Sequence, residues 1–223
     1  MIVSDRFNPF DDPELASGYE DWYATEGRTA DVAERNLLRW LLSGLPRVQT
    51  CLEIGVGTGH FARWLASEGY RVTGVDRSMP MLSEALRRGG GVVLTRADAS
   101  SLPFGDDVFD VSLLITTLEF LPYPERALYE AARVARHSVV LGALNCWHPL
   151  AWQRKRSGLP LWKVAHFYSP PELEHLVRQV LDDSVVQIRW RTTLLPGASP
   201  RFFSRLPFGA FIGMRVVLSK QKG

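Results

Sequence analysis

The stretch Leu52-Glu53-Ile54-Gly55-Val56-Gly57-Thr58-Gly59-His60 decides the fold. The apolar run that ends at Ile54 predicts a buried strand over Thr50–Ile54, and the pattern after the glycines predicts a helix over residues 59–68. The three glycines let the backbone turn sharply and approach a ligand without interference from a Cβ atom. A strand, a glycine-rich turn and a helix in this order are typical of a cofactor loop.

This loop differs from the dinucleotide-binding fingerprint, which asks for Gly or Ala where the chain has His60. A carboxylate at Glu53 suits a ligand with a cationic amine better than a pyrophosphate. The N-terminus of the following helix favours a negatively charged group. S-adenosylmethionine (SAM) carries both an amine and a carboxylate in its methionyl part, so the loop favours SAM.

Outward from the loop, β-rich runs alternate with helical patterns, which predicts βαβ units and a mostly parallel sheet. Further strands are predicted over Arg71–Asp76, 92–96, 109–116, 138–145, 185–192 and 210–220, and further helices over 31–42, 79–88, 125–136 and 170–181.

Two carboxylates follow predicted strands, on the side of the sheet where α/β proteins bind ligands. Asp76 ends the second strand, where such a carboxylate accepts hydrogen bonds from a ribose diol. Asp98 follows the third strand and suits the adenine amino group. Together with the glycine loop, these carboxylates predict a SAM site rather than simple turn caps.

The composition limits the remaining possibilities. With 223 residues, 26 basic and 24 acidic side chains and a net charge of +2, the chain predicts one domain over residues 1–223 without a nucleic-acid footprint. Cys51 and Cys146 form neither a disulfide framework nor a metal-ligand spacing, so we expect no metal. No signal peptide or membrane-spanning run is recognised, and a soluble cytoplasmic protein is expected.

In these motifs the chain resembles the class I SAM-dependent methyltransferases, in particular the small-molecule "type 11" group. The resemblance covers about residues 19–145. Its motifs are the glycine loop, Asp76 before Ser78-Met79-Pro80-Met81, Ala97-Asp98-Ala99 before Leu102-Pro103-Phe104, Phe109-Asp110-Val111, Leu118-Glu119-Phe120 and Arg133-Val134. It implies an α/β fold with a Rossmann-like seven-stranded sheet, mostly parallel with an antiparallel last strand, and helices on both faces.

The resemblance also implies which residues contact SAM and its product S-adenosylhomocysteine. By position it assigns Glu53, Gly55, Gly57 and Gly59 to the methionyl end, Asp76 to the ribose, and Asp98 with Ala99 to the adenine. Further candidates for cofactor contacts are Val56, Arg77, Met81 and Thr116. Tyr19 and Tyr23 are candidates as well, and the alternatives for them are a place in the acceptor pocket or simple packing of an N-terminal helix.

The domain is expected to comprise an N-terminal helical segment (1–45), a SAM-binding core (46–145), an active-site cover (146–169) and a closing helix and strands (170–223). The cover is irregular and rich in Trp and His, including Trp147 and Trp152. A general base is optional for methyl transfer, and His148 and His166 are its candidates. The expected acceptor is a small molecule with apolar or aromatic character.

Other functions stay open from the sequence. One is a non-catalytic SAM-binding regulatory protein. Another is a methyltransferase acting on RNA or on a membrane-associated lipid or quinone, with residues 201–208 touching a membrane surface. DNA is not expected, because Thr116-Thr117-Leu118-Glu119 stands where DNA-amine methyltransferases have an Asp/Asn-Pro-Pro-aromatic tetrapeptide. The identity of the acceptor, the methylated atom and the oligomeric state are not indicated.

Overall fold

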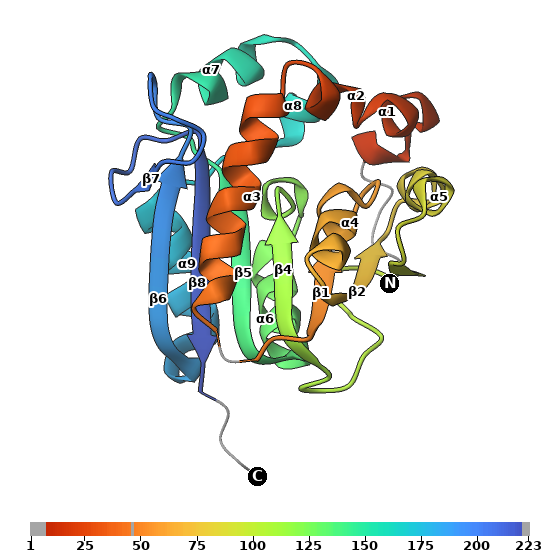
Figure 1. Ribbon diagram of the computed structural model, residues 1–223, viewed down its shortest axis with the longest axis vertical. Helices are drawn as coiled ribbons and strands as arrows, with labels where there is room; N and C mark the ends of the chain where they lie inside the picture. The colour runs from red at the N-terminus through yellow and green to blue at the C-terminus, as the bar shows by residue number, and fades with distance from the viewer. Residues whose placement is uncertain (1–7, 46, 220–223) are drawn as a thin grey trace.

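A single mixed sheet crosses the molecule, with its strands in the order β3-β2-β1-β4-β5-β8-β6-β7 (Figure 1). The computed structural model describes residues 8–45 and 47–219. Within them the strands are β1 (Thr50–Ile54), β2 (Arg71–Asp76), β3 (Val93–Arg96), β4 (Phe109–Ile115), β5 (Ala135–Leu144), β6 (Val185–Thr193), β7 (Phe203–Ser204) and β8 (Phe211–Leu218).

The first five strands pair in parallel, and β8 runs antiparallel between β5 and β6. The predicted α/β, Rossmann-like arrangement with a mixed sheet is therefore confirmed. The expected number of seven strands is wrong, because the described residues form eight. The chain turns back after β6, and two residues of β7 pair with Thr192 and Thr193. A two-residue strand is too short to show a period-two pattern in the sequence.

Helices cover both faces of this sheet, with α3 and α4 in front of it in Figure 1 and α6 and α9 behind it. The α-helices are α1 (Pro13–Gly18), α2 (Asp21–Ala24), α3 (Arg28–Ser43), α4 (His60–Ser67), α5 (Met79–Arg88), α6 (Pro124–Val134), α7 (Pro149–Arg156), α8 (Pro160–Val164) and α9 (Pro170–Leu181). Short 3₁₀ turns are η1 (Pro9–Asp11), η2 (Leu118–Phe120) and η3 (Asp182–Ser184). The predicted start of α9 is confirmed, since Ser169 and Glu172 form a capping box there.

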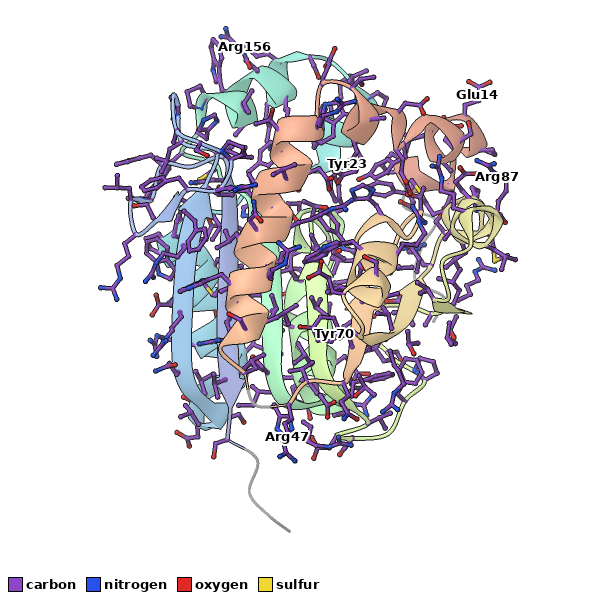
Figure 2. The ribbon with its side chains drawn as sticks, viewed as in Figure 1. Glu14, Tyr23, Arg47, Tyr70, Arg87 and Arg156 are labelled. Atoms are coloured by element: carbon purple, nitrogen blue, oxygen red, sulfur yellow. The ribbon has the colours of Figure 1, made fainter. Side chains whose placement is uncertain are left out.

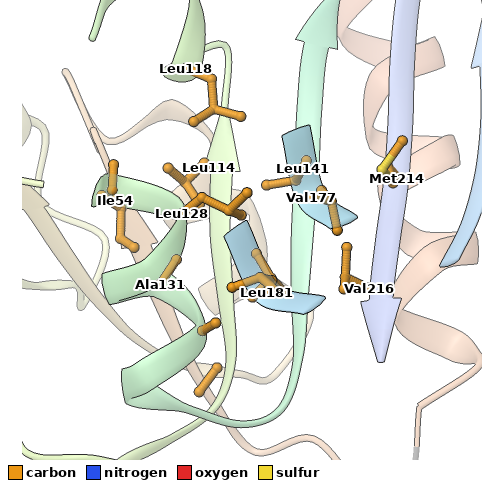
Figure 3. Packing of buried hydrophobic residues seen from close by; sticks show 14 of the residues in the cluster. Ile54, Leu114, Leu118, Leu128, Ala131, Leu141, Val177, Leu181, Met214 and Val216 are labelled. Atoms are coloured by element: carbon orange, nitrogen blue, oxygen red, sulfur yellow. The ribbon is translucent and has the colours of Figure 1, made fainter. Parts of the chain in front are cut away.

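Each face of the sheet has its own apolar core. Behind it, Leu128 of α6 and Val177 of α9 pack with Leu114 and Leu141 of the sheet (Figure 3). Burying a side chain of this size contributes about 1.5–3 kcal/mol. Strand β4 is buried at every position, as is typical of a parallel strand covered on both faces.

The C-terminal ends of the parallel strands point toward the upper edge of Figure 1, where α1, α2, α7 and α8 gather. The N-terminal segment and the segment after β5 therefore reach the same end of the molecule. Across the described residues, we find no helix that combines the length and the apolar character needed to span a membrane.

Candidate functional site

A cavity of about 660 Å³ lies beyond the C-terminal ends of β1, β2, β3 and β4. Residues 8–10 and Val164 of α8 also contribute to its wall. The cavity brings together most of the predicted cofactor residues, namely Tyr19, Tyr23, Glu53, Gly55, Val56, Gly57, Asp76, Arg77, Met81, Asp98, Ala99 and Thr116. Gly59 is not among the lining residues and instead forms the N-cap of α4.

The glycine loop takes a backbone conformation that suits glycine. Gly55, Gly57 and Gly59 have φ angles of +73°, +53° and +82°. A Cβ atom on Gly55 would lie 2.4 Å from Cγ2 of Thr117, whereas one on Gly57 would meet no protein atom within 4 Å. Because Gly57 lines the cavity, its missing side chain leaves space for a ligand close to the backbone.

Asp76 connects the end of β2 to this loop. Its Oδ2 accepts a hydrogen bond from the backbone N–H of Gly57 at 2.8 Å, and its Oδ1 accepts one from Ser78 at 2.9 Å. Burial raises the pKa of Asp76, and these backbone hydrogen bonds oppose the rise. The carboxylate is thereby held in one orientation on the cavity wall.

Glu53, at the same end of the cavity, is only 2% exposed. Its Oε2 is buried and has no hydrogen-bond partner among the described residues. Burial raises the pKa of Glu53 to about 8, although the nearby Arg63 guanidinium opposes this shift. A buried carboxyl oxygen without a partner is costly. A ligand that donates a hydrogen bond there would remove that cost.

Asp98 stands at the third strand end of the cavity. Its Oδ1 accepts hydrogen bonds from the backbone N–H and the hydroxyl of Ser100, at 2.8 and 2.7 Å. Ala99 lines the cavity beside it. The three strand ends thus present Glu53, Asp76 and Asp98 along one wall.

Another part of the cavity wall is aromatic. Phe10 contacts Phe120 edge to face, with ring centroids 4.9 Å apart, and Tyr19 lies 6.3 Å from Phe10. Tyr23, labelled in Figure 2, stacks on His60 at 3.9 Å. These rings come from η1, η2, α2 and the turn after α1, so segments distant in the sequence form this part together.

Two buried carboxyl groups lie beside this aromatic part. Burial raises the pKa of Glu34 to about 8 and that of Glu119 to about 7. Oε1 of Glu119 accepts from the backbone of Leu144, and its Oε2 has no partner among the residues that the structure describes. The partly buried Arg154 of α7 favours the charged form of both carboxyls. The neighbourhood is therefore polar as well as aromatic.

The N-terminal segment is fastened to the glycine-loop helix by Glu20. Its carboxylate accepts from the Thr58 hydroxyl at 2.6 Å and from Arg63 at 2.6 and 2.7 Å, and Arg88 donates to it at 3.2 Å. Burial alone would raise the pKa of Glu20, but hydrogen bonds from His60, Thr58 and Arg63 lower it to about 2. This cluster places Tyr19 and Tyr23 over the cavity.

The histidines predicted as candidate bases do not reach the cavity. Nδ1 of His148 accepts from Leu150 N and caps α7, and Nε2 of His166 pairs with Glu172 at 2.7 Å. Trp147 and Trp152 are exposed rather than part of the lining. The cover contributes Val164 to the cavity instead.

Several lining residues were missed by the sequence analysis. Phe120 belongs to the Leu118-Glu119-Phe120 motif, so its position after β4 was a usable signal. Phe10 and Val164 carry no motif, and contacts between η1 and α8 bring their elements together. His60, the residue that departs from the dinucleotide fingerprint, also lines the cavity.

Residues 52–141 match the family model described as a methyltransferase domain. A crystal structure of a Thermotoga maritima protein, described as a SAM-dependent methyltransferase and possible histamine N-methyltransferase, is 28% identical to this chain with a TM-score of 0.75. The alignment covers 93% of this chain and 98% of the T. maritima chain. An uncharacterised protein of Mycobacterium tuberculosis is 35% identical over 73% of this chain and 56% of its own length.

Demethylmenaquinone methyltransferase of Paenarthrobacter aurescens is 31% identical over 52% of this chain and 42% of its own length. The chain thus spans about half the length of these two curated relatives.

Proposed function

Since the chain is a SAM-dependent methyltransferase, we propose that its cavity holds SAM at the glycine-loop end and a small apolar or aromatic acceptor at the aromatic end. In this proposal the whole of residues 1–223 acts as one methyltransferase domain. The cofactor contacts expected from the sequence are assigned to the residues that line the cavity.

The observation that carries the proposal is the unpartnered Oε2 of Glu53 beside the glycine loop. Its carboxyl fits the amine of the methionyl part, and the open space at Gly57 fits a ligand pressed against the backbone. Asp76 fits the ribose hydroxyls and Asp98 with Ala99 the adenine, since they end the neighbouring strands.

When bound, SAM supplies a methyl group on a positively charged sulfur. The residues of this chain hold the acceptor beside it and keep water away, which accounts for much of the rate of such a displacement. Phe10, Phe120 and Tyr19 provide the apolar wall for this purpose. In this proposal α8 forms part of the active-site cover through Val164, and His148 and His166 have structural roles.

The aromatic end supports an acceptor with a ring or another flat apolar part. One relative is named a demethylmenaquinone methyltransferase, and the T. maritima protein is described as a possible histamine N-methyltransferase. Both names describe ring compounds. We assign the acceptor to that broad class and leave the methylated atom open.

Isothermal calorimetry of the purified chain tests the cofactor part. We expect SAM and S-adenosylhomocysteine to bind with micromolar affinity and NAD not to bind. Glu53→Gln should weaken SAM binding, whereas Glu14→Gln, an exposed carboxylate on α1 (Figure 2), should not. Binding of NAD without either SAM or its product would disprove the proposal.

The acceptor part is tested with ring-containing amines and quinols and with radiolabelled SAM. For any compound that is methylated, Phe120→Ala should lower kcat/KM by about tenfold or more while SAM affinity stays within a few-fold. A loss of SAM affinity as large as the loss of turnover would place Phe120 at the cofactor instead.

A further inference from the structure

Two segments at the cover end of the molecule contain no acidic residue. Residues 146–171 and 194–210 hold Arg154, Lys155, Arg156, Lys163, Arg201 and Arg205 but no Asp or Glu. All except Arg154 are exposed. Within the described part of the chain, Lys163, Arg201 and Arg205 have no ion-pair partner. The two segments together therefore carry six basic residues and no acidic one, although the chain as a whole carries a net charge of only +2.

The same segments expose large apolar side chains. In the cover these are Trp147, Leu150, Trp152 and Leu159, of which Trp152 is 59% exposed. The segment between β6 and β8 adds Phe202, Leu206 and Phe208. Apolar side chains gathered in this way on an otherwise polar surface mark an interaction site.

The two segments form one continuous surface. The rings of Trp147 and Phe208 lie 6.2 Å apart, and Nδ2 of Asn145 donates to the carbonyls of Pro207 and Gly209. Both segments lie at the upper edge of Figure 1, with Arg156 at the top of the molecule in Figure 2. We name residues 147–163 with 201–208 the basic aromatic surface.

We propose that the basic aromatic surface docks on an anionic lipid bilayer. Tryptophan rings and leucines enter the boundary between headgroups and acyl chains, while the neighbouring Lys and Arg pair with anionic headgroups. Leu150, Leu159 and Leu206 cannot stack on bases, and single-stranded RNA sites depend on such stacking. The mixture of exposed leucines, aromatics and cations therefore favours a bilayer over RNA.

The position of this surface relates it to the cavity. Helix α8 belongs to both, since Lys163 is exposed on the surface and Val164 lines the cavity. Docking would bring the cover side of the cavity next to the bilayer. The acceptor proposed above would then be a membrane-resident ring compound; this last step rests on the proposed function, whereas docking itself does not.

Sedimentation of the full chain with vesicles tests the docking without cofactor or acceptor. We expect binding to vesicles of phosphatidylcholine mixed with phosphatidylglycerol, little binding to phosphatidylcholine alone, and weakening by salt. The double variant Arg156→Glu/Arg205→Glu should lower the partition coefficient by roughly tenfold or more. Arg47→Glu is the matched control, since Arg47 lies at the opposite end of the molecule (Figure 2) and should change it little.

Trp152→Ser tests the apolar contribution and should lower the partition coefficient by several-fold, whereas Leu86→Ser, an exposed position on α5, should not. Unchanged circular dichroism spectra show that all variants are folded. SAM binding is measured separately by calorimetry, so a failure to bind lipid is distinct from a failure to bind SAM. No binding to anionic vesicles at low salt would overturn the inference. An equal loss of vesicle binding in the control variants would overturn it too. So would binding of single-stranded RNA by the chain without binding of anionic vesicles.

Discussion

Two parts of the cavity wall, which we call the glycine-loop end and the aromatic end, are built in different ways. At the glycine-loop end, Gly57 N donates to Asp76, and Gly55 and Val56 donate to the carbonyl of Val75, so backbone groups of adjacent strands set the shape. At the aromatic end the wall consists of side chains from η1, η2, α2 and α8.

This difference predicts how each end responds to substitution. A wall made of backbone groups tolerates few substitutions, because a new side chain must allow both the positive φ angles and the backbone hydrogen bonds of the loop. A wall of side chains can repack around a smaller residue at modest cost. We therefore expect substitutions at the loop to damage cofactor binding severely and those at the aromatic end to alter acceptor choice and stability.

The largest effect is expected for Gly57→Val. Its side chain would enter the cavity from a position with a φ angle of +53°, where a β-branched residue is strained. We expect SAM affinity in calorimetry to fall by about a hundredfold or more. Gly69→Val is the matched control, since Gly69 also has a positive φ of +98° and open space but lies outside the cavity. Equal affinity losses in both variants would mean that strain alone is responsible.

The next effect is expected for Asp76→Ala. Removing a carboxylate that accepts hydrogen bonds should cost about 1.5–3 kcal/mol of SAM binding. Asp183→Ala, an exposed position in η3, should leave the dissociation constant unchanged. If a folded Asp76→Ala protein bound SAM as the wild type does, the ribose assignment would be wrong.

An effect of similar size, with a pH signature, is expected for Glu53. Burial gives it a pKa of about 8 in the free protein, so it is neutral at lower pH. The cationic amine of SAM favours the carboxylate, and binding then releases a proton. Affinity should rise as the pH increases from 6 to 8, by up to about tenfold per unit, and Glu53→Gln should remove this rise. A pH dependence of the dissociation constant that persists in Glu53→Gln would assign the linked proton to another group.

The smallest effect concerns the aromatic end. Burial raises the pKa of Glu34 to about 8, above its unfolded value of about 4.5. Between those values the folded protein keeps a proton that the unfolded chain has lost, so the free energy of unfolding falls as pH rises through this window. Glu34→Gln should reduce that fall by on the order of 1 kcal/mol in urea titrations at pH 5 and pH 9. Glu14→Gln should not reduce this fall. If the free energy of unfolding of Glu34→Gln fell with pH as steeply as that of the wild type, the raised pKa of Glu34 would be contradicted.

The two ends of the cavity also differ in how far the sequence predicts them. Glu53, Asp76 and Asp98 follow strands directly, so local pattern and parallel pairing suffice to bring them together. Phe10 and Val164 line the same cavity because their elements, about 150 residues apart in the chain, are in contact, and no local pattern encodes such a contact. Trp147 and Trp152 were expected in an enclosed cover, yet both are exposed. Short helices without a clear apolar stripe give no signal for the face that is buried.

The position of β8 bears on the order in which the molecule can fold. Strand β8 lies between β5 and β6, so β6 has no neighbour on that side until Phe211–Leu218 has been synthesised. The parallel strands that carry the glycine loop and both aspartates are complete some 70 residues earlier, at Leu144. During translation the cofactor half can therefore assemble first. Strand β6 joins the sheet only after β8 has been synthesised and pairs with both β5 and β6.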